Sequence, residues 1–195
     1  MTVNGKRKGD ETERVVQREL QKAIGNQHGM EFKRNPYEQA REKNHSDIVC
    51  DNPLWCFAVE VKRRKSGNFK QEWMDQAAEA AKVTNQFPVV IYRFDHQQFQ
   101  VAMRLGDLIQ MYFGKNSDFD DLNTENVTIS LSCFFVIAKE VFGDVKRDPQ
   151  RFARKKCPDC DGSGEVEKTI KDPSGFPYEI DVMVKCPECE GAGLC

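Results

Sequence analysis

The stretch 54-LWCFAVEVKRRK-65 decides how the chain is interpreted. Residues 54–61 are almost all apolar, which is typical of a strand in the interior of a sheet. Because side chains alternate along a strand, Glu60 and Lys62 share one face, opposite Val59 and Val61. A carboxylate and an ammonium group on one face of a buried strand need either a charged partner or a chemical task.

The residues before this stretch predict a second strand joined to it by a tight connection. Residues 46–51, SDIVCD, form a short apolar run, and Asn52-Pro53 is typical of a turn. Asp47 stands at the start of that run, so the pattern is an acid, a gap, and then acid-x-lysine. Such a pattern also arises by chance in charged chains, in which each carboxylate is a surface residue or a salt-bridge partner.

The remaining sequence alternates between helical and strand patterns. Apolar residues recur at helical spacing over 10–24, and residues 70–84 have the alanine-rich composition of a helix. Further strands are predicted over 87–94 and 98–105, and a short helix over 105–113. The segment 128–138, TISLSCFFVIA, fits either another strand or a buried helix. The order of these elements predicts an α/β fold with a mixed central sheet flanked by helices.

Composition narrows the class of protein. The chain has 195 residues, a net charge of -2 and 39% hydrophobic residues, which indicates a folded protein and excludes wholesale disorder. Its longest mostly apolar run is too short for a membrane helix, and the charged start of the chain lacks a secretory signal, so we expect a cytoplasmic protein. No nucleotide-binding loop is present, so no nucleotide cofactor is expected.

The composition changes near residue 148, which predicts a larger domain over 1–147 and a small module over 148–195. Fewer than 50 residues are too few for a self-sufficient apolar core. Two CxxC pairs lie in this module and have the spacing of a tetrahedral zinc site, with a disulfide as the alternative. The predicted zinc ligands are Cys157, Cys160, Cys186 and Cys189.

Each CxxC pair belongs to a longer repeat, CPDCDGSG and CPECEGAG. These repeats resemble the CxxCxGxG units of the cysteine-rich domain of DnaJ-type co-chaperones. That family has four units and two zincs, whereas this chain has two units, so the resemblance implies one structural zinc. The His-Pro-Asp signature of a J-domain is missing from the sequence, which argues against a chaperone role.

Residues 8 to about 104 resemble the PD-(D/E)xK nuclease superfamily, and most closely its archaeal-type Holliday-junction resolvases. The motifs that carry this resemblance are Lys8-Gly9-x-x-x-Glu13-Arg14, Ser46-Asp47-Ile48-Val49, Glu60-Val61-Lys62-Arg63-Arg64-Lys65 and Gln76. Ser46 stands where the superfamily name has proline. The resemblance implies a restriction-endonuclease-like core for residues 1–147.

The resemblance also implies a catalytic set, Glu13, Asp47, Glu60 and Lys62. The three carboxylates and the Val61 carbonyl would bind Mg²⁺ or Mn²⁺, while Lys62 would position or deprotonate the attacking water. A further set would contact backbone phosphates without reading sequence. Its members are Lys8, Arg14, Arg63, Arg64, Lys65 and Gln76. For Gln76 the alternative is an ordinary exposed helix residue.

The resemblance therefore implies a magnesium-dependent, structure-selective DNA endonuclease, most closely a Holliday-junction resolvase acting on branched DNA. Resolving a junction needs two symmetric cuts, so a homodimer is expected, with residues 127–141 as a dimer or core element. A compact resolvase suits a phage. Two alternatives stay open: another DNase of the same superfamily acting on duplex or single strands, and a non-catalytic, zinc-dependent adaptor that binds DNA or protein.

Overall fold

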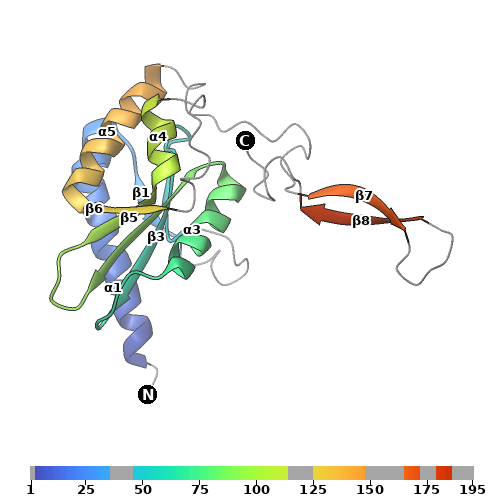
Figure 1. Cartoon of the computed structure of the whole chain (residues 1–195). Helices are drawn as coiled ribbons and strands as arrows, with labels where there is room; N and C mark the ends of the chain where they lie inside the picture. The colour runs from blue at the N-terminus through green and yellow to red at the C-terminus, as the bar shows by residue number, and fades with distance from the viewer. Residues whose placement is uncertain (1–2, 36–45, 114–124, 148–164, 172–178, 186–195) are drawn as a thin grey trace. The chain divides into compact units, whose positions relative to one another are not determined.

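A computed structural model describes residues 3–35, 46–113, 125–147, 165–171 and 179–185 of the protein (Figure 1). The chain divides into two compact units, Met1–Phe152 and Ala153–Cys195, which are described separately below. No helix in the described ranges is long and apolar enough to cross a membrane.

A six-stranded sheet forms the centre of the first unit, with its strands in the order β1-β2-β3-β4-β5-β6. β3 and β4 run parallel, and every other neighbouring pair is antiparallel. The sheet is therefore mixed, as the sequence predicts. The strand bounds are β1 Phe32–Arg34, β2 Ile48–Cys50, β3 Phe57–Arg64, β4 Phe87–Phe94, β5 Gln100–Arg104 and β6 Asn126–Ser130.

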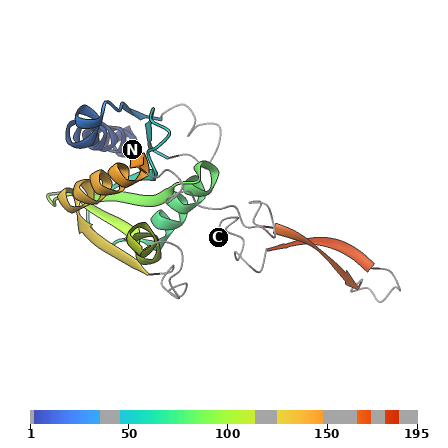
Figure 2. The ribbon, with the colours of Figure 1, turned by 90° about the horizontal axis from the view of Figure 1, so that it is seen from above.

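Helices cover both faces of this sheet. Figure 2 shows α1 and α5 on one face and α3 on the other. Their bounds, with the short helical segments between them, are α1 Val3–Leu20, η1 Gln21–Gly25, α2 Asn26–His28, α3 Gln71–Thr84, α4 Leu105–Phe113 and α5 Leu131–Arg147. The predicted α/β fold, a mixed sheet flanked by helices, is thus confirmed.

Two apolar cores follow from the alternation of side chains along the strands. On the first face, Val16 and Leu20 of α1 and Phe134 of α5 pack with Val59 of β3. On the second face, α3 packs its buried residues against alternate residues of β4. Strands β3 and β4 are buried on both faces, which explains their almost continuous apolar sequences.

The first helix is longer and less regular than the predicted helix over 10–24. It begins at Val3. The sequence did not predict this start, because the charged first turns of the helix carry no apolar periodicity. It then passes into a π-helical turn, Gln21–Gly25, before α2. Such single turns carry one extra residue per turn and change the direction of the side chains that follow.

The ambiguous segment 128–138 belongs to two elements. Burial stays partial along β6, Asn126–Ser130, as expected for a strand at the edge of the sheet. From Leu131 the chain continues as α5, where Phe134 and Ala138, four residues apart, are fully buried. This segment contributes to the core, and its part in a dimer stays a prediction.

The second unit contains an antiparallel strand pair, β7 Glu165–Lys171 and β8 Glu179–Lys185. Their register pairs Glu165 with Lys185 and Lys171 with Glu179. The four cysteines predicted to bind zinc, at positions 157, 160, 186 and 189, lie outside the described residues.

Candidate active site

Two carboxylates meet where β2 enters the sheet beside β3. Asp47 directly precedes β2, and its N–H donates to the Val59 carbonyl at 3.0 Å. The Val61 N–H donates to Asp47 Oδ2 at 2.7 Å, which turns that carboxylate towards the strand carrying Glu60. Both acids are buried, Asp47 at 8% exposure and Glu60 at 1%. The fold thus brings together two acids predicted from sequence to act together.

Burial and nearby charged groups govern the electrostatics of this pair. Burial, followed by the charge of Glu60, raises the pKa of Asp47 from its usual 3.8 to about 8, although the Val61 N–H opposes this rise. Burial also raises the pKa of Glu60, against the opposing effect of the Lys62 ammonium group. Burial thus favours the protonated form of each acid relative to an exposed carboxylate, while the hydrogen bond between the two side chains opposes this rise at Glu60.

Lys62 lies beside the pair and is held from two sides. Its Nζ donates to Glu60 Oε1 and, at 2.8 Å, to Gln76 Oε1 of α3. Glu60 and Lys62 are two residues apart on β3, so both side chains leave the same face of the strand. The amide of Gln76 thus orients Lys62. Gln76 therefore differs from an ordinary exposed helix residue, which would make no such hydrogen bond.

Glu13 reaches the same region from α1 but has a partner of its own. Arg34, the last residue of β1, donates from Nε at 3.0 Å and from Nη2 at 2.7 Å to Glu13 Oε2. The same Nη2 donates to Asp10 Oδ1 at 3.0 Å. The charge of Glu13 contributes to the raised pKa of both Asp47 and Glu60, so it acts electrostatically on the pair.

The Asp47–Glu60 pair fits a hard divalent cation. Glu60 Oε2 is buried and has no hydrogen-bond partner among the described residues. Mg²⁺ is commonly held by one or two carboxylates and keeps several waters, which suits two acids beside backbone. No group of three or more His, Cys, Asp or Glu residues gathers at one point in the described part of the chain, so Glu13 does not complete a three-ligand set.

Comparisons with known proteins identify the family. Residues 4–144, well over half of the chain, match the family described as "Phage putative PDDEXK endonuclease". The chain belongs to this PDDEXK endonuclease family. No curated protein matches the chain.

A solved structure is also similar to this PDDEXK family member. It is Archaeoglobus fulgidus Hjc, described as a Holliday junction resolvase from an archaeal hyperthermophile. The sequences are 21% identical, the match covers 68% of this chain and 99% of that chain, and the TM-score is 0.39.

The basic residues predicted to contact DNA differ in their surroundings in this PDDEXK endonuclease. Arg63 is already paired, with its Nε donating to Asp95 Oδ1 at 2.8 Å. Arg64 is exposed, and its guanidinium lies 5.9 Å from the centre of the Trp73 ring. Two more members, Arg14 and Lys65, are exposed, while Lys8 lies in α1 and its side chain is outside the described set.

Arg34 is a residue of this PDDEXK endonuclease that the sequence analysis did not single out. It ends a three-residue strand, just before Asn35-Pro36, and nothing in its local sequence distinguishes it from the other 28 Lys and Arg residues. Its importance appears only when β1 is placed beside α1, where it binds Glu13 and Asp10 together. No spacing or motif signal marks this contact.

Proposed function

We propose that this member of the PDDEXK endonuclease family hydrolyses phosphodiester bonds of DNA with Mg²⁺ or Mn²⁺ held by Asp47 and Glu60. The observation that carries the proposal is the pair itself: two buried carboxylates, one with an oxygen lacking a hydrogen-bond partner among the described residues, beside Lys62. Buried acids whose pKa is raised by burial, next to a charged partner, are typical of functional sites.

Each residue of the site has a proposed role. Asp47 and Glu60 hold the cation, with the Val61 carbonyl as a further ligand, and Glu13 contributes through a water molecule. When bound, the cation lowers the pKa of the attacking water and stabilises the charge that develops on the phosphate. Lys62 positions that water or takes its proton, and Gln76 keeps the Lys62 ammonium group in place.

Binding to DNA is proposed to rest on the phosphate backbone. Positive side chains attract the backbone regardless of sequence, which suits an enzyme selecting the shape of its substrate. The proposed phosphate contacts are Lys8, Arg14, Arg63, Arg64, Lys65 and Gln76. For Arg63 this contact requires sharing or releasing Asp95, its partner in the protein.

The proposed substrate is branched DNA, a four-way junction, cut by a homodimer. The motifs from Lys8 to Gln76 that resemble archaeal resolvases support this choice. Two sites related by a two-fold axis would make the two symmetric cuts that resolution requires. As a phage enzyme, the protein would act on DNA in the cytoplasm of the host cell.

Cleavage of three labelled substrates tests this proposal. With Mg²⁺, we expect paired, symmetric nicks in a four-way junction, at a rate about tenfold or more above that of a matched duplex or single strand, equivalent to ~1.4 kcal/mol of transition-state binding. Equal rates on junction and duplex would keep the nuclease and reject junction selectivity. Binding of the junction without any cleavage would favour the non-catalytic adaptor.

We also propose a division into a nuclease domain, 1–147, and a zinc module, 148–195. The spacing of the two CxxC pairs supports one zinc, bound by all four thiolates in a structural site without an open position. The glycines after each pair allow backbone N–H groups to point at the sulfurs.

Elemental analysis of the purified, reduced protein should find one zinc per chain. We expect Cys157→Ser to lose this zinc, because three thiolates remain of four. Cys133→Ser is the matched control, since Cys133 is a free, exposed cysteine on α5. A reduced protein that contains no zinc, and whose module forms two disulfides when it is purified without reductant, would contradict the proposal.

A further inference from the structure

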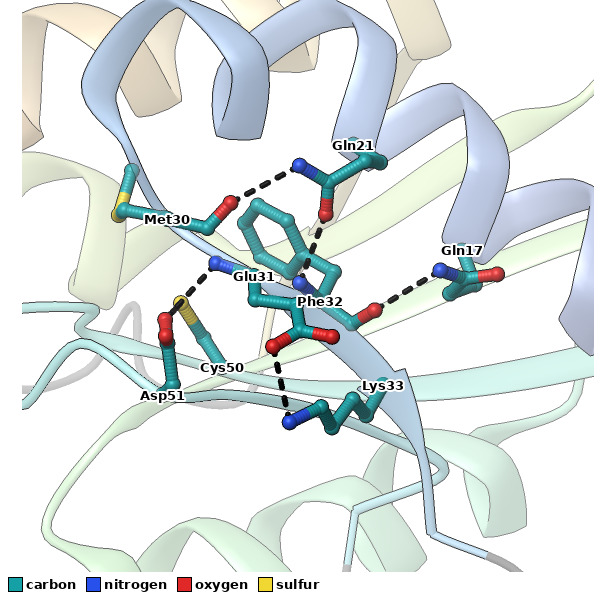
Figure 3. Close-up of polar contacts among 8 residues, drawn as sticks. All are labelled: Gln17, Gln21, Met30, Glu31, Phe32, Lys33, Cys50 and Asp51. Carbon is teal, nitrogen blue, oxygen red and sulfur yellow. Dashed lines mark hydrogen bonds and ion pairs between the residues drawn. The ribbon is translucent and has the colours of Figure 1, made fainter.

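Three polar residues of the first helical segment face β1 at a spacing of four. Glu13, Gln17 and Gln21 lie above one another on the same side of the helix, as this spacing requires. Glu13 binds Arg34 at the end of β1, as described above. The two glutamines contact the backbone around Phe32, two residues earlier on the strand (Figure 3).

The glutamines hydrogen-bond to the open side of an edge strand. Gln17 Nε2 donates to the Phe32 carbonyl at 2.8 Å. The Gln21 amide makes two contacts with this segment, donating to the Met30 carbonyl at 2.9 Å and accepting from the Phe32 N–H at 2.9 Å. It also donates to Asn26 Oδ1 at 3.1 Å. Within the described sheet, β1 has a neighbouring strand on one side only, β2. The two amide side chains therefore take the place of a strand on the other side.

The local backbone is shaped around the Gln21 contact. Gln21 begins the π-helical turn that ends at Gly25, and the Met30 N–H donates to the Gly25 carbonyl at 3.0 Å. A Cβ atom at Gly25 would lie 2.4 Å from Gln21 Nε2 and 2.7 Å from the Met30 carbonyl oxygen. Only glycine leaves room there for the amide of Gln21 to reach Met30.

These contacts set the register of β1 against the helix. One helical turn advances by 5.4 Å, so a shift of one turn would move Glu13 out of reach of Arg34. With Phe32 fixed by Gln17 and Gln21, Arg34 is held two residues further along the strand, opposite Glu13. The observed N–O distances of 2.7 and 3.0 Å depend on this register.

We propose that Gln17 and Gln21 are positioning residues, which lock β1 to the first helix so that Arg34 holds Glu13 beside the Asp47–Glu60 pair. This inference rests on the proposed function, since it assumes that Glu13 takes part in cleavage. Neither glutamine touches the reacting groups. Their effect on catalysis passes through the Glu13–Arg34 contact.

Cleavage by variants in two backgrounds tests the inference. Gln17→Met and Gln21→Met remove hydrogen bonds at similar side-chain length, and each single variant leaves the other glutamine to hold the fold. In the parent protein we expect each to slow junction cleavage about tenfold, because small misplacements of catalytic groups have large effects on rate. In a Glu13→Gln background we expect no further loss. Gln86→Met is the matched control, since Gln86 Nε2 also donates to a backbone carbonyl, that of Trp55 at 2.8 Å, but outside the first helix and β1.

A spectroscopic measurement gives a second readout that needs neither metal nor DNA. The Arg34 side-chain Nε–H should give a distinct, protected NMR signal while it donates to Glu13, and Arg34→Lys assigns that signal by its disappearance. We expect the signal to shift or broaden in Gln17→Met and Gln21→Met, and to stay unchanged in Gln86→Met. A merely structural role of the glutamines would lower the melting temperature and leave this signal in place.

The outcomes distinguish failure of the positioning role from failure of the proposed function. Equal slowing in both backgrounds, or unchanged cleavage with an unchanged Arg34 signal, overturns the positioning role alone. Full cleavage by Glu13→Gln removes Glu13 from the proposed function, and the inference fails with it. If the parent protein cuts no DNA, the proposed function fails, and the Arg34 signal alone decides whether the glutamines position Glu13.

Discussion

Glu60→Gln is expected to reduce DNA cleavage by about a thousandfold, or ~4 kcal/mol of transition-state stabilisation. The amide keeps the size of the side chain but carries no charge to hold the proposed cation. It also weakens the hold on Lys62, whose Nζ donates to Glu60 Oε1. Single-turnover cleavage of a labelled junction, with the variant in excess over DNA, measures this loss without interference from product release.

The control for Glu60→Gln is Glu31→Gln, which removes a carboxylate from an exposed ion pair with Lys33. Cleavage by this control should match the parent protein, because exposed ion pairs contribute little to stability. Junction binding by Glu60→Gln, measured without divalent metal, should also match. Cleavage by Glu60→Gln at a tenth of the parent rate or more would contradict the proposed role of Glu60.

Asp47→Asn is expected to stabilise the metal-free protein at alkaline pH. The pKa of Asp47 is about 8 in the folded state, against 3.8 for an unperturbed aspartate, so the folded protein holds this proton more tightly. The free energy of unfolding therefore falls as pH rises from about 4, and the loss is complete above about pH 8. An asparagine side chain does not ionise, so the variant does not show this loss of unfolding free energy.

Thermal unfolding in the presence of a chelator, at pH 5 and at pH 9, measures this effect. At pH 9 we expect Asp47→Asn to exceed the parent in unfolding free energy by about 1–3 kcal/mol, the cost of burying a poorly satisfied polar group. At pH 5 the two should be nearly equal. Asp75→Asn, which changes an exposed residue of α3, is the control.

Added Mg²⁺ should reverse the order of stability at pH 9. A ligand that binds only the folded state stabilises it, so the parent should melt at a higher temperature with Mg²⁺. Asp47→Asn should show no such rise. If the parent and the variant respond equally to Mg²⁺, Asp47 does not hold the cation. If Asp47→Asn is the less stable at pH 9 without metal, ionisation of buried Asp47 does not destabilise the folded protein.

Most of the central sheet could be predicted from sequence because its strands are locally unambiguous. The run that ends in Glu60 and Lys62 is apolar on both faces, and this pattern predicts a central strand whichever strands pair with it. Asp47 lies one short turn away, so its approach to Glu60 follows from strand pairing within a compact stretch of chain. The Asp47–Glu60–Lys62 group was predictable for this reason.

The contacts of α1 with β1 could not be predicted in the same way. Arg34 and Glu13 are 21 residues apart, and their pairing depends on the register between a helix and a three-residue strand. That register is set by side-chain amides and by a π-helical turn, and neither leaves a periodic signal in the sequence. Helical periodicity predicted a helix at 10–24 but not the extra residue in its last turn.

The closure of the β1 edge also has an electrostatic consequence. Lysine commonly protects exposed strand edges, since its charge discourages pairing with other chains. At position 17 a lysine would place a positive charge one helical turn from Glu13, where it would compete with Arg34 for that carboxylate. Gln17 and Gln21 instead close the edge with neutral groups. This edge of the sheet is thereby shielded against unwanted strand addition without any change in the net charge around the acids.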